Sequence, residues 1–93
     1  MMIDDYASRR WREAAIEAGI APTDWPAMFT ADRGVNSARR GHIAWLMYQP
    51  DAEGKHPTWP QIARAFGRRS HTGIMAAAKL HAERFKTPRP PIR

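Results

Sequence analysis

Glycines and prolines interrupt this chain of 93 residues so often that no segment between them is longer than an ordinary helix. Gly19 is a natural stop after the first segment. Pro50 ends the segment that holds the longest apolar run, residues 43–48, because proline lacks the N–H that continues a helix. Within the segments, apolar residues recur with the 3.6-residue period of a helix, and none alternates as a strand would. These features predict an all-α domain of about five helices around one modest core.

Five segments carry the helical pattern, and three of them follow a residue that is suited to cap a helix. Thr23, Thr58 and Ser70 each have a hydroxyl that can accept a hydrogen bond from a free N–H of the first helical turn. Pro60 fits the first turn of the fourth segment, and Gly67 closes that segment. The expected helices span residues 5–18, 25–29, about 36–49, 59–66 and about 71–85.

The chain divides into one domain, residues 1–86, and a short tail, residues 87–93. Three of the seven tail residues are prolines, so the tail is not expected to be helical and has the composition of a linker. A linker at this position is consistent with a further C-terminal region that recruits RNA polymerase or another replication or transcription protein.

Several classes of protein are excluded by what the sequence lacks. There is no cysteine, which excludes a disulfide scaffold, a cysteine nucleophile, an iron–sulfur cluster and a thiolate zinc site. The four histidines lack the spacing of metal ligands and no nucleophile–base pattern occurs, so we expect no metal, no cofactor and no enzymatic activity. No apolar run approaches the ~18 residues of a membrane span, and the N-terminus lacks the apolar region of a signal peptide. We therefore expect a cytoplasmic protein without a membrane partner.

The basic residues are concentrated in one part of the chain. Fifteen Lys and Arg stand against nine Asp and Glu, for a net charge of +6, and twelve of the fifteen are arginine. Residues 1–32 carry three cations and six acids, whereas residues 33–93 carry twelve cations and three acids. The planar guanidinium suits phosphates and guanine edges, so this distribution favours a polyanionic partner. A solvated basic surface is the alternative interpretation.

Residues 58–80 combine two helical segments with a tight turn between them, which is typical of a helix-turn-helix motif. In that motif the first residues of the second helix face the base edges of the major groove of DNA. An ordinary corner between two packed helices is the alternative. Here the first residues of the second helix are Ser70, His71, Thr72 and Gly73, and Arg68 and Arg69 directly precede them.

This turn resembles a known signature. Residues 66–74 read Phe-Gly-Arg-Arg-Ser-His-Thr-Gly-Ile, and the DNA-binding domain of the bacterial replication initiator DnaA typically reads Phe-Gly-Gly-Arg-Asp-His-Thr-Thr-Val there. Upstream, Trp-Pro-x-Ile-Ala at 59–63 is similar to the family's Leu-Pro-x-Ile-Gly, and His-Ile-Ala-Trp at 42–45 is similar to its Gln-Ile-Ala-Met. The resemblance covers about residues 14–84.

The resemblance implies a Trp-repressor-like helix-turn-helix bundle in which the last helix docks in the major groove. By their places in the signature, His71 and Thr72 touch bases and Arg69 matches the signature's arginine. Arg33 matches the loop residue that enters the minor groove. The family's ATPase has no counterpart here, because the chain contains no Gly-rich phosphate-binding motif.

The chain departs from the family at three positions. Ser70 replaces an aspartate that reads a base edge, and Gly73 replaces a threonine. Gly41 stands where the family has a DNA-contacting arginine, and the adjacent Arg39 and Arg40 are expected to replace it. We therefore expect a target that differs from the initiator's standard box.

These observations together predict sequence-specific binding of double-stranded DNA, by a transcription regulator or its DNA-binding module, at the nucleoid. The alternative is a replication-control or protein-interaction module that competes with or assists the initiator, without ATPase activity. The candidate DNA-contacting residues are Arg33, Arg39, Arg40, Arg64, Arg68, Arg69, Ser70, His71, Thr72 and Lys79.

Overall fold

The computed structural model describes residues 5–29, 35–68 and 70–85, and all regular structure in these ranges is helical. Four of the elements are α-helices and one is a 3₁₀ helix, with no strand in this part of the chain. The prediction of an all-α domain with about five helices is confirmed. The elements are α1 (Asp5–Glu17), η1 (Pro22–Phe29), α2 (Val35–Tyr48), α3 (Trp59–Ala65) and α4 (Thr72–Phe85).

Two helices begin earlier than the sequence pattern indicated, and the prediction that Thr23 caps the second one is wrong. η1 begins at Pro22, so Thr23 lies inside the 3₁₀ helix instead of capping it. A proline fits the first position because its missing N–H would have no partner there anyway. α2 begins at Val35, one residue before the expected start at about residue 36. Neither first turn gives a periodic signal, because its side chains are mostly exposed.

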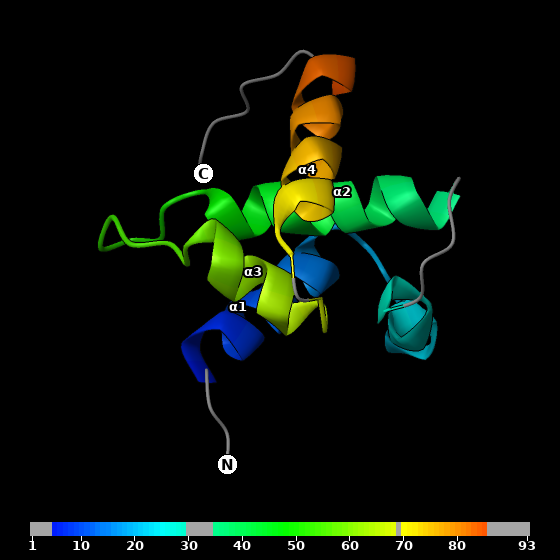
Figure 1. Cartoon of the computed structure of the whole chain (residues 1–93). Helices are drawn as coiled ribbons and strands as arrows, with labels where there is room; N and C mark the ends of the chain where they lie inside the picture. Colours follow the sequence, from blue (N-terminus) through cyan, green and yellow to red (C-terminus); the bar gives the residue numbers. More distant parts are fainter. Residues whose placement is uncertain (1–4, 30–34, 69, 86–93) are drawn as a thin grey trace.

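α2 lies at the centre of the fold and contacts each of the other four helices. Figure 1 shows α4 crossing α2, with the second half of α4 extending away from the rest of the molecule. α1 and α3 contact each other and lie on the other side of α2 from this projecting half (Figure 1). The first half of α4, from its contact with α3 to its crossing with α2, is therefore the part that packs against the rest of the molecule.

The core is built around Trp11 of α1. Its ring makes edge-to-face contacts with Trp25 and Phe66, with centroids 5.3 and 5.8 Å apart, and stacks on Phe29 at 5.3 Å. Such pairs contribute ~0.5–1.5 kcal/mol each beyond their buried area. Trp11 is buried, and the other three tryptophans pack half-buried against the core. All four tryptophans thus pack in or against the core.

α2 and α4 cross at Gly41, where almost no space separates the two helices. A Cβ added at Gly41 would overlap the carbonyl oxygen of Ala77 in α4. A glycine inside a helix costs ~1 kcal/mol relative to alanine, and the close approach of α4 explains why one is present here. A side chain at position 41 would point into α4, where it could not reach a DNA duplex.

The carboxylate of Asp51 organises the loop between α2 and α3. Its Oδ1 accepts the backbone N–H groups of Glu53 and Lys55, both at 2.9 Å, and its Oδ2 accepts the Tyr6 hydroxyl of α1 at 3.3 Å. Hydrogen bonds of this kind favour the charged form of a carboxyl group. The N–H of Lys55 makes the largest contribution, and the pKa of Asp51 is lowered from its ordinary value of 3.8. The ionised carboxylate thus ties this loop to α1.

Candidate nucleic-acid interface

α3 begins with two reciprocal hydrogen bonds that fix its first turn. The Thr58 hydroxyl accepts the Gln61 N–H at 3.3 Å, and the Gln61 side-chain oxygen accepts the Thr58 N–H at 2.9 Å. Pro60 lies in this first turn, and Ile62 and Ala63 are buried in the core. The predictions that Thr58 caps the helix and that Pro60 lies in its first turn are confirmed.

The turn after α3 has the hydrogen bonds of a Schellman motif. The Arg68 N–H donates to the Ala63 carbonyl at 2.9 Å, and the Gly67 N–H donates to the Arg64 carbonyl at 2.8 Å. Gly67 has a φ of +74°, in the left-handed region that only glycine adopts without steric cost. Phe66 is fully buried and holds the turn against the core. The turn that leads into α4 is therefore well defined, and Gly67 closes α3 as predicted.

The Ser70 hydroxyl accepts a hydrogen bond at the start of α4. The Met75 N–H donates to the His71 carbonyl at 2.8 Å, and the Ser70 hydroxyl accepts the Thr72 N–H at 3.3 Å. Ser70 therefore satisfies a free N–H of the first turn as predicted, although the N-cap position itself belongs to His71. The side chains of Ser70 and Thr72 are exposed, and that of His71 is half-buried. All three residues lie at the solvent-accessible start of α4.

The exposed face of α4 begins with the small side chains of Thr72 and Ala76 and continues to Lys79. Thr72, Ala76 and Lys79 recur at i, i+4 and i+7 and are all exposed, whereas Ile74 and Ala78 on the opposite face are buried. Ala76 was not among the candidates from the sequence, although its spacing from Thr72 could have identified it. This face lets another molecule come close to the helix.

Gly73, in the first turn of α4, is exposed and is not required by the packing of the chain. A Cβ added there would have no heavy atom within 4 Å. Glycine lowers helix stability by up to ~1 kcal/mol relative to alanine, so the fold itself gains nothing from it. The presence of Gly73 is thus not explained by any contact among the described residues.

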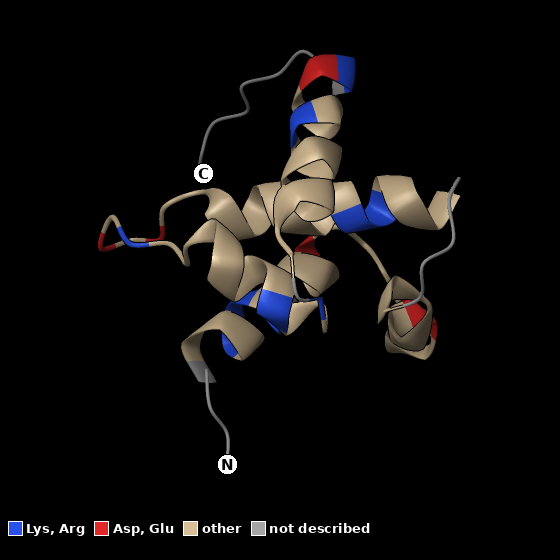
Figure 2. Cartoon of the chain, viewed as in Figure 1, with Lys and Arg blue, Asp and Glu red and all other residues tan. Residues whose placement is uncertain are grey.

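Basic side chains flank the start of α4. Arg64 in the last turn of α3 is exposed, Arg68 in the turn is half-buried, and Lys79 is exposed on α4. Figure 2 shows basic residues at the end of α3 and in the turn that leads to α4. The first turn of α4 contains no acidic residue, and the helix N-terminus adds a partial positive charge. This end of the molecule is therefore suited to an anionic partner.

The remaining candidates are placed differently. Arg39 in α2 is partly exposed, and its guanidinium lies 3.8 Å from the Asp24 carboxylate of η1, an exposed ion pair worth ~0–1 kcal/mol. Arg40 is only 6% exposed. The expectation that Arg40 contacts phosphate does not hold in this fold, because its side chain is buried. Outside the described residues lie Arg33, Arg69 and the tail, 87–93.

Comparisons of the chain with protein-family models, with curated proteins and with solved structures found no match. Within the described ranges, no helix is long and apolar enough to cross a membrane. The same ranges contain no group of three or more His, Asp or Glu side chains that could hold a metal ion. Function is therefore inferred from the geometry and charge of this chain.

Proposed function

We propose that the chain binds double-stranded DNA sequence-specifically, with the start of α4 in the major groove, as a helix-turn-helix protein does. The observation that carries this proposal is the first turn of α4, where Gly73 is exposed and has no packing role. Glycine permits close approach of another molecule to the helix backbone, and the major groove is wide enough to admit a helix that makes such an approach. The resemblance of residues 66–74 to the DnaA signature supports the same role.

Base recognition falls to the polar side chains at the start of α4. The hydroxyls of Ser70 and Thr72 can donate or accept hydrogen bonds, and the His71 ring adds a further donor or acceptor. The Schellman turn and the Ser70–Thr72 hydrogen bond already hold this segment. Little conformational entropy is therefore lost when these side chains meet a base edge.

Phosphate contacts fall to Arg64, Arg68 and Lys79, which flank the start of α4. Such contacts position a protein on the duplex without reading its sequence. Arg33 and Arg69 remain candidates from the sequence for the minor groove and for the turn. We infer that the chain is a transcription regulator, or the DNA-binding module of one, that acts at the nucleoid.

Fluorescence anisotropy with a labelled duplex of about 20 base pairs tests the proposal, because two helical turns of DNA accommodate one such domain. Four engaged cations, namely Arg64, Arg68 and Lys79 with one of the candidates Arg33 and Arg69, predict a slope of about −3.6 in log K against log salt. Binding should therefore weaken about a hundredfold between about 50 and about 200 mM salt. No binding at the lower concentration, or an affinity that salt leaves unchanged, would contradict the proposal.

Substitutions that each remove one positive charge test which surface of the protein binds DNA. Arg64→Gln and Arg68→Gln should each reduce the magnitude of the salt slope by about 0.9. Lys55→Gln is the matched control, because Lys55 is exposed in the loop between α2 and α3 and follows the acidic Asp51 and Glu53. Equal losses in all three variants would indicate a diffuse charge effect and would contradict a defined surface at the start of α4.

A further inference from the structure

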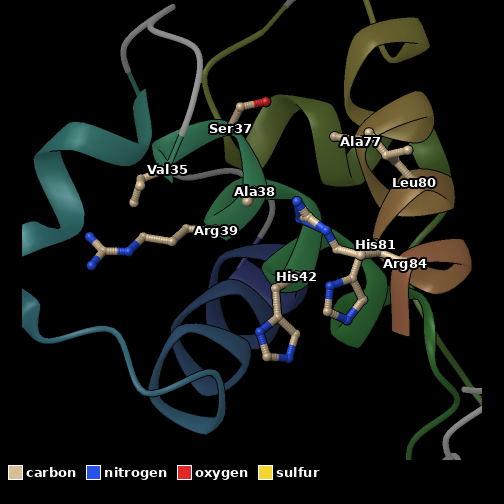
Figure 3. Close-up of a pocket in the computed structure, with 9 residues that line it drawn as sticks. All are labelled: Val35, Ser37, Ala38, Arg39, His42, Ala77, Leu80, His81 and Arg84. Carbon is tan, nitrogen blue, oxygen red and sulfur yellow. The ribbon is translucent and has the colours of Figure 1, made fainter. Parts of the chain in front are cut away.

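A hollow of about 370 Å³ lies between the first half of α2 and the second half of α4. Its walls include Val35 and Leu80, which are 68% and 60% exposed, and two alanines, Ala38 and Ala77 (Figure 3). Four large hydrophobic side chains are exposed in the described part of the chain, and two of them line this hollow. Apolar side chains that gather in a concave surface are typical of a ligand site.

Basic side chains line the same hollow. Figure 3 shows Arg84 extending from α4 toward α2, near the paired rings of His42 and His81. These two rings stack on one another with centroids 4.4 Å apart. Arg39 lines the α2 side. None of the described residues that line the hollow is acidic, and Arg84 supplies its main positive charge, because Arg39 pairs with Asp24 of η1.

The size of the hollow limits what can fill it. At ~30 Å³ for each water-sized group, it has room for about a dozen non-hydrogen atoms. The occupant that fits the volume, the apolar walls and the basic side chains is a small molecule with both an apolar and an anionic part.

We propose that this hollow binds a small organic anion with an apolar body, of the class of aryl- or alkylcarboxylates. Arg84 pairs with the carboxylate, because a guanidinium presents two parallel donors to it. The apolar body lies between Val35 and Leu80 and removes part of their exposed surface from water.

This binding does not depend on the DNA proposal. No residue of the first turn of α4 lines the hollow. His81, which does, lies about 13 Å along the helix from Thr72, at 1.5 Å for each residue. Ala77 of the hollow is next to Ala76 on the exposed face of α4, but the residues proposed to read bases and those that line the hollow are different, so each surface can be tested by its own substitutions.

An NMR titration of the isotope-labelled chain with 3-phenylpropionate tests the proposal. This probe has an aromatic body, one carboxylate and about eleven non-hydrogen atoms, which matches the hollow. We expect a Kd of about 1 mM or lower, with the largest amide shifts on both walls, near Ala38 and Leu80. 3-Phenylpropanol lacks the charge and inorganic phosphate lacks the apolar body, so each should bind at least about tenfold more weakly.

Two variants test the two parts of the site. Arg84→Gln removes the charged donor and should weaken 3-phenylpropionate at least about tenfold. Ala38→Phe fills the hollow and should abolish binding. Ala38 is exposed, so the larger side chain need not enter the core. Lys55→Gln removes a charge elsewhere and should leave the affinity unchanged within about twofold.

Several results would overturn the proposal. These are the absence of shifts up to about 10 mM probe, equal binding of 3-phenylpropanol or inorganic phosphate, and unchanged affinity in Arg84→Gln. Unchanged affinity in Ala38→Phe would place the probe outside the hollow and would overturn it as well. Each of these outcomes can occur whether or not the chain binds DNA, so failure here and failure of the DNA proposal are distinguishable.

Discussion

Gly41 and Gly73 both lie within helices, but only Gly41 is explained by the packing of this chain. Gly41 lies where α2 and α4 cross, and a Cβ there would overlap the backbone of Ala77. At Gly73, in the first turn of α4, a Cβ would meet nothing. Packing between α2 and α4 therefore requires a glycine at position 41, whereas no packing contact requires the glycine at position 73.

The same difference holds for the residues around each glycine. Near the crossing, Arg40 and Ile43 of α2 and Ala78 of α4 are buried. Near Gly73, the side chain of Thr72 on the exposed face contributes nothing to the core, whereas Ile74 on the opposite face is buried. Residues that packing requires respond to mutation through stability. Residues that packing does not require should respond through binding, and this contrast can be measured.

The largest effect on stability is expected at Ile74, the buried residue that follows Gly73 in α4. Ile74→Ala should lower the free energy of unfolding by ~2–5 kcal/mol, because Ile74 is 3% exposed and its removal leaves a cavity. Urea denaturation measures this change. A loss below ~1 kcal/mol would mean that the first half of α4 is not packed against the core, and the contrast would fail.

A smaller but still clear loss is expected at the crossing. Gly41→Ala should lower the free energy of unfolding by ~1–3 kcal/mol, because the added Cβ forces α2 and α4 apart. For a domain of this size each kcal/mol corresponds to about 4–8 °C in Tm, which circular dichroism detects. An unchanged or raised Tm would contradict the close approach of Gly41 to Ala77.

Gly73→Ala is the matched substitution at the other glycine and should have the opposite sign. It should raise the free energy of unfolding by up to ~1 kcal/mol, because alanine favours the helix and nothing obstructs the new methyl group. The same variant should weaken DNA binding in the anisotropy assay. A loss of stability would show that Gly73 has a role within the fold and would remove the main support for the DNA proposal.

The smallest effect concerns the loop that Asp51 organises. Because the pKa of Asp51 is lowered in the folded protein, the direction in which stability changes with pH can be predicted. The charged carboxylate stabilises the fold above the ordinary pKa of 3.8, and this contribution is lost as the pH falls through the lowered pKa. Wild type should therefore be more stable than Asp51→Asn near neutral pH, and the difference should shrink as the pH falls below 3.8. Denaturation of both proteins across this range measures it, and a constant difference would contradict the role of the charge.

The helices near the candidate site could be predicted because their signals are local. Thr58 with Gln61, and Gly67 after a buried Phe66, are cap and turn patterns that depend only on neighbouring residues. The start of η1 was missed because Thr23 has the chemistry of a cap while Pro22 has already entered the helix.

The burial of Arg40 could not be predicted, because it depends on how other helices pack around α2. Adjacent positions on a helix point about 100° apart, so Arg39 and Arg40 cannot both occupy the same face. Which of them is exposed depends on contacts with distant parts of the chain, and the sequence shows two equivalent arginines. The hollow was not foreseen for the same reason, since Val35 and Leu80 are brought together only when α4 crosses α2.

Selection of bound duplexes from a random DNA pool tests most directly the central claim that the start of α4 reads DNA sequence. Wild type should enrich a defined site. His71→Ala and Thr72→Ala should relax the preference at a few adjacent base pairs, each costing ~1–3 kcal/mol at the wild-type site, while thermal stability changes little. An identical enriched site for wild type and both variants, or no enriched site at all, would contradict the claim.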